Sequence, residues 1–384
     1  MRNPLGAALE RLRGRFERPD PTESTGGADG DDPTTSDAAA TATTRERLLG
    51  TTRRGLLARV AGLGAAAGGF RAVDNVLLGY GVLVGTNLRA QQLTPLFTDS
   101  LTFTDRRYPL SDGRTLAYAE GTLAVERGDE RVAAIDVFEV TPATAGGFDA
   151  RHDLPGTPGP AEELARDLGA IRAGDLTVEP LGLDAFFERA RGAETRPYAV
   201  GPLRGPFHDE VAPETVAAFT DADPADPAAS VDGLATAFRE HTDYDLPRYT
   251  AGSVEDNVLA GAVDLRQHFE SDVEYGAVGD GGHTGLFCYE YARRAAEAFH
   301  AVPPTRQTLP VAAAEVIDDR HKHVYTALTT LVREDGGDGD LRLLATFLDY
   351  THVAMYDDAA AQWLMGEGLE AYDSRHRATE VKWY

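Results

Sequence analysis

The pattern of apolar and polar positions is sharpest in the C-terminal third of the chain. Residues 254–271 place apolar side chains at helical spacing behind an acidic start, and the run from Cys288 to about His300 repeats that spacing, so both are predicted as helices. Apolar and polar residues alternate at 321–332 and 341–351, which predicts two paired strands joined by a turn. The expected order is helix, glycine-rich loop, cysteine-bearing helix and hairpin.

Strand periodicity also appears upstream. Segments 114–125 and 131–140, joined by Glu-Arg-Gly-Asp-Glu, predict a β-hairpin. Helical patterns follow at 162–172 and 183–192, separated by connectors rich in proline, glycine and aspartate. This combination of helices and hairpins predicts an α+β fold.

The first 70 residues differ in composition from the rest. Residues 1–45 have no apolar period and are rich in Asp, Thr, Gly and Pro, so this acidic leader is expected to be disordered. Residues 46–70 contain Arg53-Arg54 followed by an apolar, Ala/Gly-rich run, which is the pattern of a twin-arginine export signal. Because Arg59 interrupts that run, an amphipathic helix is the alternative, and a cytoplasmic location is favoured over export.

Charged residues also bear on membrane insertion. Arg59, Arg71 and Asp74 break any apolar stretch of the ~20 residues that a spanning helix needs, so no stable membrane span is expected. The chain is thus expected to divide into the leader, the twin-arginine-like segment, a region of unknown role at 71–245 and a C-terminal domain at 246–384.

The whole chain is strongly acidic. Its formal net charge is −25 with a pI near 4.7, and Lys322 and Lys382 are the two lysines among 37 basic residues. This composition is typical of proteins that stay soluble in multimolar salt, where electrostatic screening shortens to roughly 3 Å. No basic stripe with interleaved aromatic residues occurs, which argues against a nucleic-acid partner.

Cys288 is the one cysteine of the chain, which excludes an intramolecular disulfide. It shares helical spacing with Tyr291, Ala295 and Phe299, so a buried structural role is one interpretation. The other interpretation is catalytic. Cys288 follows a glycine-rich loop and begins its predicted helix, where unpaired N–H groups and the helix dipole stabilise a thiolate.

A base and an orienting carboxylate are present downstream. His323 begins a predicted strand and can project toward the end of a neighbouring helix as a general base. Asp349 ends the partner strand, where it would lie next to His323 and fix its tautomer. Cys288, His323 and Asp349 are therefore the predicted catalytic residues. His352 is a weaker alternative base and otherwise an exposed polar residue at the strand end.

These residues occur in three short motifs: Cys288-Tyr289-Glu290-Tyr291-Ala292, His323-Val324-Tyr325 and Leu348-Asp349-Tyr350-Thr351. The motifs and their order resemble transglutaminase-like domains, which have a papain-like fold, over about residues 250–355. The resemblance implies that Cys288 is the nucleophile, His323 the general base and acid, and Asp349 the residue that orients His323. It also implies acyl transfer on a peptide or other amide substrate, with hydrolysis favoured over crosslinking, and no cofactor is expected.

Two other functions stay open. A non-catalytic interaction or structural protein could keep the same fold, with Cys288 sealed in the core and His323 facing elsewhere. A metal-dependent hydrolase is the second alternative, because His321 and His323 lie on one face of a strand, close in sequence to Asp318 and Asp319. No further ligand set with structural-zinc spacing accompanies them.

Aromatic residues continue to the end of the chain. The tail from Trp363 to Tyr384 holds both tryptophans and several further apolar side chains. A frayed end would not be so aromatic, so this tail is expected to pack against the core.

Overall fold

A computed structural model describes residues 88–205, 211–244, 284–319, 323–333, 339–355, 369–372 and 376–383. Several predicted features lie outside these residues: the leader at 1–45, the twin-arginine-like segment at 46–70, the helix at 254–271, most of the glycine-rich loop before Cys288, His321 and Trp363.

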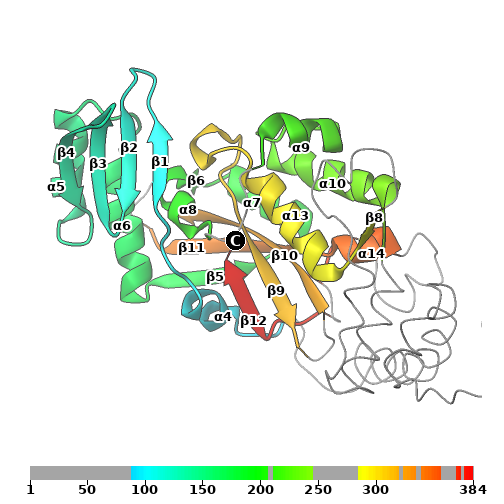
Figure 1. The fold of residues 1–384 in the computed structure, drawn as a ribbon. Coiled ribbons are helices and arrows are strands. Elements are labelled where there is room, and N and C mark those ends of the chain that lie inside the picture. Colours follow the sequence, from blue (N-terminus) through cyan, green and yellow to red (C-terminus); the bar gives the residue numbers. More distant parts are fainter. Residues whose placement is uncertain are drawn as a thin grey trace, which may run out of the picture. The chain divides into compact units, whose positions relative to one another are not determined.

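The part of the chain before residue 245 contains both helices and strands (Figure 1). Its strands are β1 (Arg106–Pro109), β2 (Thr115–Ala119), β3 (Thr122–Arg127), β4 (Glu130–Asp136), β5 (Leu176–Pro180), β6 (Glu194–Thr195) and β7 (Thr242–Tyr244). Its helices are α4 (Leu93–Asp99), α5 (Pro142–Arg151), α6 (Pro160–Ala173), α7 (Leu183–Arg191), α8 (Pro197–Leu203), α9 (Pro213–Thr220) and α10 (Pro227–His241). The predicted helices at 162–172 and 183–192 are confirmed by α6 and α7.

The C-terminal part contains the remaining described elements. In chain order these are β8 (Thr284–Leu286), α13 (Cys288–His300), the short 3₁₀ helix η3 (Pro304–Arg306), β9 (Ala312–Asp318), β10 (His323–Arg333), β11 (Leu341–Leu348), α14 (Tyr350–Met355) and β12 (Glu380–Trp383). The predicted cysteine-bearing helix is confirmed by α13, which begins at Cys288.

Strands β1 to β4 form an antiparallel meander. The prediction of one strand over 114–125 is wrong, because the chain reverses at Glu120 and Gly121 and forms β2 and β3. Both residues have positive φ, 48° and 83°, as in the tight two-residue turns whose twist matches that of paired strands. β3 then pairs with β4, which ends at Asp136, before the predicted strand end at 140.

The main sheet has the strand order β12-β9-β10-β11-β5, with β6 paired to β10. Its pairs are antiparallel except β11 with β5, which is parallel. The predicted pair at 321–332 and 341–351 is confirmed by β10 and β11. The second strand ends at Leu348, however, because residues 350–355 form the helix α14. Since β5 continues this sheet, strands from both sides of residue 245 build it.

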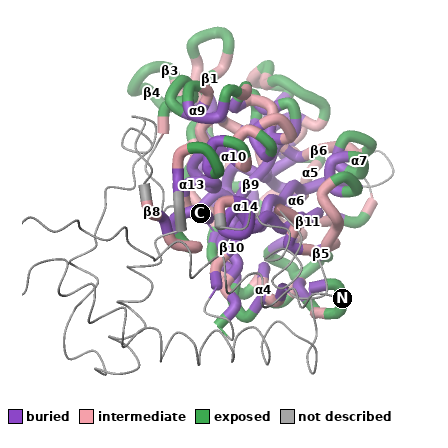
Figure 2. Tube along the Cα trace, turned by 90° about the vertical axis from the view of Figure 1, so that its right-hand side faces the viewer, coloured by how far each residue is buried: buried purple, intermediate pink, exposed green. Residues whose placement is uncertain are grey.

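Both faces of the main sheet are buried. Successive side chains of a strand point to opposite faces of the sheet, and here they belong to two different hydrophobic clusters. One cluster combines these strands with residues of α4, α6 and α8, and the other combines them with residues of α7, α10 and α13. The strand residues of the first cluster include Ala314, Tyr325, Ala327, Leu343 and Phe347, and those of the second include Ala313, Leu328, Val332, Leu344 and Leu348. Figure 2 shows the buried positions gathered around β9, β10 and α13.

Helix α13 packs on β9 and β10. Tyr291 and Phe299, two turns apart on one face, are each 1% exposed, and the ring of Tyr291 meets Phe238 of α10 edge-on with centroids 5.2 Å apart. Beyond the end of the helix, the buried Arg204 donates a hydrogen bond to the carbonyl oxygen of Val302 at 2.8 Å. The apolar face and this anchor fix the axis of α13 and hence the position of Cys288 at its start.

The C-terminal strand β12 closes one edge of the main sheet by pairing with β9. The indole Nε1 of Trp383 donates to the carbonyl oxygen of Phe97 at 3.0 Å, and the two rings pack edge-on at 5.8 Å. The expectation that the tail packs against the core is confirmed for this strand.

The architecture is a mixed α+β fold, as the sequence predicts. Within the described residues, no helix combines the length and the apolar content that crossing a bilayer requires.

Candidate functional site

Cys288 is the first residue of α13 and is half-buried. The chain enters the helix through Phe287, whose N–H donates to a carboxylate oxygen of Glu290 at 2.7 Å. This contact fixes the first turn, as a glutamate at the third helical position commonly does. Tyr291 and Phe299 are buried in the core, whereas Cys288 as a residue is only partly buried.

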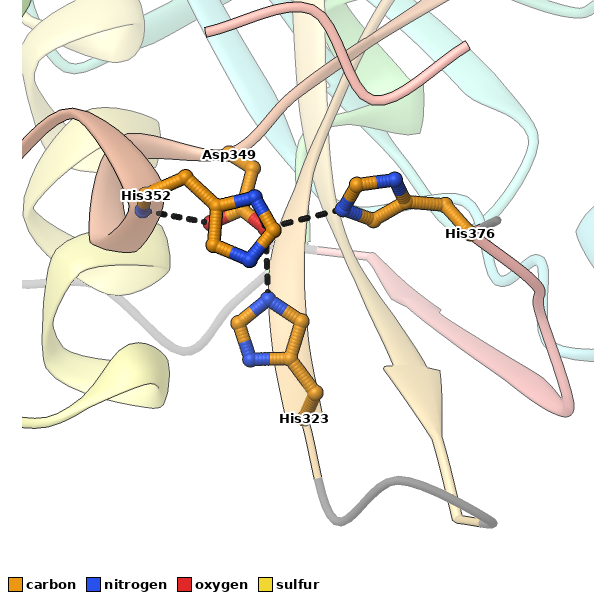
Figure 3. A group of neighbouring side chains, drawn as sticks. All are labelled: His323, Asp349, His352 and His376. Carbon is orange, nitrogen blue, oxygen red and sulfur yellow. Dashed lines mark hydrogen bonds and ion pairs between the residues drawn. The ribbon is translucent and has the colours of Figure 1, made fainter. Parts of the chain in front are cut away.

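His323 and Asp349 lie at the same end of the main sheet. His323 begins β10, and Asp349 directly follows β11, whose last residue Leu348 pairs with Thr326. Asp349 is fully buried, and its Oδ2 lies 2.6 Å from Nε2 of His323 (Figure 3). The carboxylate can therefore hold the imidazole in the tautomer that carries a proton on Nε2.

The side chain of Cys288 interacts with the same imidazole. Burial alone would lower the pKa of His323, but the negative charge of Asp349, its hydrogen bond, and a hydrogen bond and charge interaction with Cys288 hold that pKa well above the usual value. Because Nε2 is already bonded to Asp349, Nδ1 is the ring nitrogen left for the sulfur. The described residues thus form the chain sulfur–imidazole–carboxylate, in which the imidazolium is stabilised from both sides.

Asp349 is held ionised by more than His323. Burial would raise its pKa, but the charges of His323 and His352 and hydrogen bonds from His323 and His376 keep the pKa well below the usual range. The backbone N–H of His352 donates to Oδ1 at 3.2 Å, and Nε2 of His376 lies 2.9 Å from Oδ2. Both oxygens of this carboxylate are therefore engaged.

His352 and His376 complete a cluster that the sequence did not reveal. His352 lies in α14 and His376 precedes β12; they are 4% and 2% exposed, so His352 is not the exposed strand-end residue of the alternative interpretation. Nδ1 of His352 lies 3.3 Å from Oδ2 of Asp349. Three imidazoles therefore surround one carboxylate oxygen (Figure 3). Two signals for these histidines were available in the sequence. His352 follows Asp349 by three residues, and His376 lies in the aromatic C-terminal tail.

The ligand set that the sequence suggested for a metal is described only in part. His321 lies outside the described residues, and Asp319 bonds through its backbone N–H to the hydroxyl of Thr379 at 3.0 Å. His323 instead groups with Asp349, His352 and His376, whose ligand atoms all lie within 4.8 Å of one another.

A cavity of about 470 Å³ lies elsewhere, lined among others by Arg106, Tyr108, Arg204, Glu297 and His300. Arg106 and Arg204 donate to backbone carbonyl oxygens there, which is a structural use of their charge. None of the three predicted catalytic residues lines this cavity, so its size does not make it the reactive site.

Comparisons of this chain with protein-family models, with curated proteins and with solved structures gave no match. The resemblance to transglutaminase-like domains therefore rests on the three sequence motifs. The structure adds a contact of 2.6 Å between His323 and Asp349 and an interaction of Cys288 with His323 that contributes to the raised pKa of this imidazole.

Proposed function

We propose that the protein is a cysteine-dependent acyl transferase that hydrolyses a peptide or other amide bond, built on a papain-like fold of the transglutaminase-like kind. The observation that carries the proposal is the contact series from the half-buried Cys288 through His323 to the buried Asp349. A structural cysteine needs neither a partnered imidazole nor solvent access.

In the acylation step, the sulfur of Cys288 attacks the carbonyl carbon of the amide as a thiolate. The resulting tetrahedral intermediate collapses, the C–N bond breaks, and Nδ1 of His323 gives its proton to the departing amine. The product of this step is a thioester on Cys288. The position of Cys288 at the N-terminus of α13 favours a negative charge on its sulfur, because the positive end of the helix dipole lies there.

In the deacylation step, the now neutral His323 accepts a proton from a water molecule as the oxygen attacks the thioester carbon. The C–S bond breaks, a carboxylic acid leaves, and the thiolate–imidazolium pair is restored. Asp349 does not change its protonation state; it stabilises the imidazolium and keeps Nδ1 directed toward the sulfur.

The test is the reaction with p-nitrophenyl acetate in multimolar KCl. The wild type should release nitrophenol in a burst of about one equivalent per chain and then turn over steadily, because acylation and deacylation are separate steps. Cys288→Ala should lose the burst, and intact-mass spectrometry should show an acetyl group on the wild type alone. His323→Gln should show burst and turnover rates lower by roughly 10²-fold or more.

The conservative control is Cys288→Ser, which keeps the size of the side chain and removes the thiol. Equal rates for the wild type and Cys288→Ala, with no acetyl group on Cys288, would contradict the proposed function.

A further inference from the structure

The cluster around Asp349 contains more imidazoles than the proposed triad uses. One histidine suffices to activate a cysteine, yet His352 and His376 are brought to the same carboxylate from α14 and from the segment before β12. The side chains of Asp349, His352 and His376 are 0%, 4% and 2% exposed, and that of His323 is 11% exposed. We propose that His323, Asp349, His352 and His376 bind a divalent transition-metal ion of the zinc type, and that this ion switches off the cysteine.

The spacing of the four groups is close to that of a tetrahedral site. Ligand bonds of about 2.0–2.2 Å to Zn²⁺ place neighbouring ligand atoms about 3.4 Å apart. The imidazole nitrogens of His323, His376 and His352 lie 2.6, 2.9 and 3.3 Å from Oδ2 of Asp349. To admit the ion, the cluster would have to open by about 1 Å at its shortest contact. It would also have to close where its ligand atoms, all within 4.8 Å of one another, are more than about 3.4 Å apart.

The donor types select the class of metal. Three imidazole nitrogens and one carboxylate oxygen suit Zn²⁺ and Co²⁺, whereas Ca²⁺ and Mg²⁺ prefer oxygen ligands. The second oxygen, Oδ1 of Asp349, is held by the backbone N–H of His352 at 3.2 Å. A contact of this kind orients a ligating carboxylate, and it leaves Oδ2 for the ion.

The metal and the triad compete for one atom. Nε2 of His323 would bind the ion through its lone pair, so the proton of the neutral ring would move to Nδ1, the nitrogen that faces the sulfur. A ring in this state no longer accepts the thiol proton, and Cys288 loses its base. This inhibitory consequence rests on the proposed function, whereas the metal site itself does not.

The first experiment is a titration of the full chain with CoCl₂ in high KCl after removal of metals with EDTA, using Cys288→Ala as the background. One Co²⁺ per chain should bind and give the intense visible absorption of tetrahedral Co²⁺, and ZnCl₂ should displace it. Because the background lacks the thiol, this result is independent of whether the protein is an acyl transferase.

Two variants separate metal binding from hydrogen bonding. His376→Gln and His352→Asn retain an amide N–H in place of the imidazole donor but are poor metal ligands. Each should weaken Co²⁺ binding by more than the ~10–100-fold that loss of an outer-shell partner costs. His241→Ala, which removes a histidine on α10 outside the cluster, should bind Co²⁺ like the parent.

Circular dichroism of each variant reports whether it is folded. In the chain with its thiol, a stoichiometric amount of ZnCl₂ should slow alkylation of Cys288 at least tenfold, and EDTA should reverse the effect. No binding, or equal binding by all the folded variants, would overturn the metal site. Co²⁺ absorption that includes a thiolate charge-transfer band and disappears in Cys288→Ala would overturn the ligand set. Binding without slower alkylation would overturn the inhibitory role alone.

Discussion

Asp349 links the reactive pair to the interior of the protein. Its carboxylate is fully buried and accepts hydrogen bonds from the imidazoles of His323 and His376 and from the backbone of His352. A buried charge is tolerated only when it is paired and hydrogen-bonded, and here the partners meet that requirement. The orientation of His323 therefore depends on Asp349 and, through it, on His352 of α14 and on His376, which precedes β12.

Removing the charge of Asp349 should weaken the thiolate–imidazolium pair. In Asp349→Asn, burial still lowers the pKa of His323, but the carboxylate charge that raises it is gone, so the imidazole loses its proton at a lower pH. The rate of iodoacetamide labelling of the metal-free protein at pH 6.5 should fall by about tenfold, which is the effect of one pKa unit. An unchanged rate in the folded variant would contradict the role assigned to the carboxylate.

The sequence located three of the residues in this site because each stands at the boundary of an element with a clear period. Cys288 begins a helix, His323 begins a strand and Asp349 directly follows one, and such boundaries can be predicted from hydrophobic alternation. His376 could not be found in this way. It lies 27 residues after Asp349 in a segment without a period. Long-range contacts bring it near, among them the pairing of β12 with β9 and the hydrogen bond from the backbone N–H of Leu88 to the carbonyl oxygen of His376.

At the scale of elements, the main sheet carries the site because β9, β10 and β11 are long, apolar and buried on both faces. The alternation of β10 and β11 was readable, but β9 was not predicted from the sequence. The parallel pairing of β11 with β5 joins segments more than 160 residues apart and leaves no local signal. The tight turn at Glu120 and Gly121 was missed for another reason. Glutamate is not among the residues that usually accept positive φ, so the sequence read as one strand.

The C-terminal strand should contribute strongly to stability. Trp383 is 4% exposed, bonds to the carbonyl oxygen of Phe97 and packs on its ring, and Trp383→Ala removes all of these contacts. The free energy of unfolding in urea should fall by about 3–5 kcal/mol, the usual cost of truncating a buried tryptophan. Trp383→Phe keeps most of the apolar volume and should lose clearly less. Equal, small losses for both variants would show that β12 does not hold the tail on the core.

At the scale of the whole molecule, we expect the net charge of −25 to make the stability of the folded state depend on salt. The Debye length is about 10 Å at 0.1 M salt and about 3 Å at 1 M, so repulsion between carboxylates is weak only in concentrated salt. The melting temperature followed by circular dichroism should rise steadily from 0.1 M to 3 M KCl. Sucrose, which does not screen charge, should stabilise much less. A melting temperature that is constant or falls over this range would contradict this interpretation of the acidic surface.

The central claim is that Cys288 and His323 form a thiolate–imidazolium pair, and the most direct measurement is the pH dependence of iodoacetamide alkylation. Because the chain has one cysteine, the total signal needs no site assignment. The comparison is between the metal-free wild type and His323→Ala, both in high salt, with the unfolded chain as the reference for a free thiol.

We expect the folded wild type to be labelled much faster than the unfolded chain at about pH 6, because the thiolate is the reactive form and His323 lies beside the thiol. In His323→Ala this low-pH reactivity should disappear, and the profile should move toward that of the unfolded chain. Slow labelling of the folded wild type at every pH, unchanged by the substitution, would contradict the account and identify Cys288 as a structural residue.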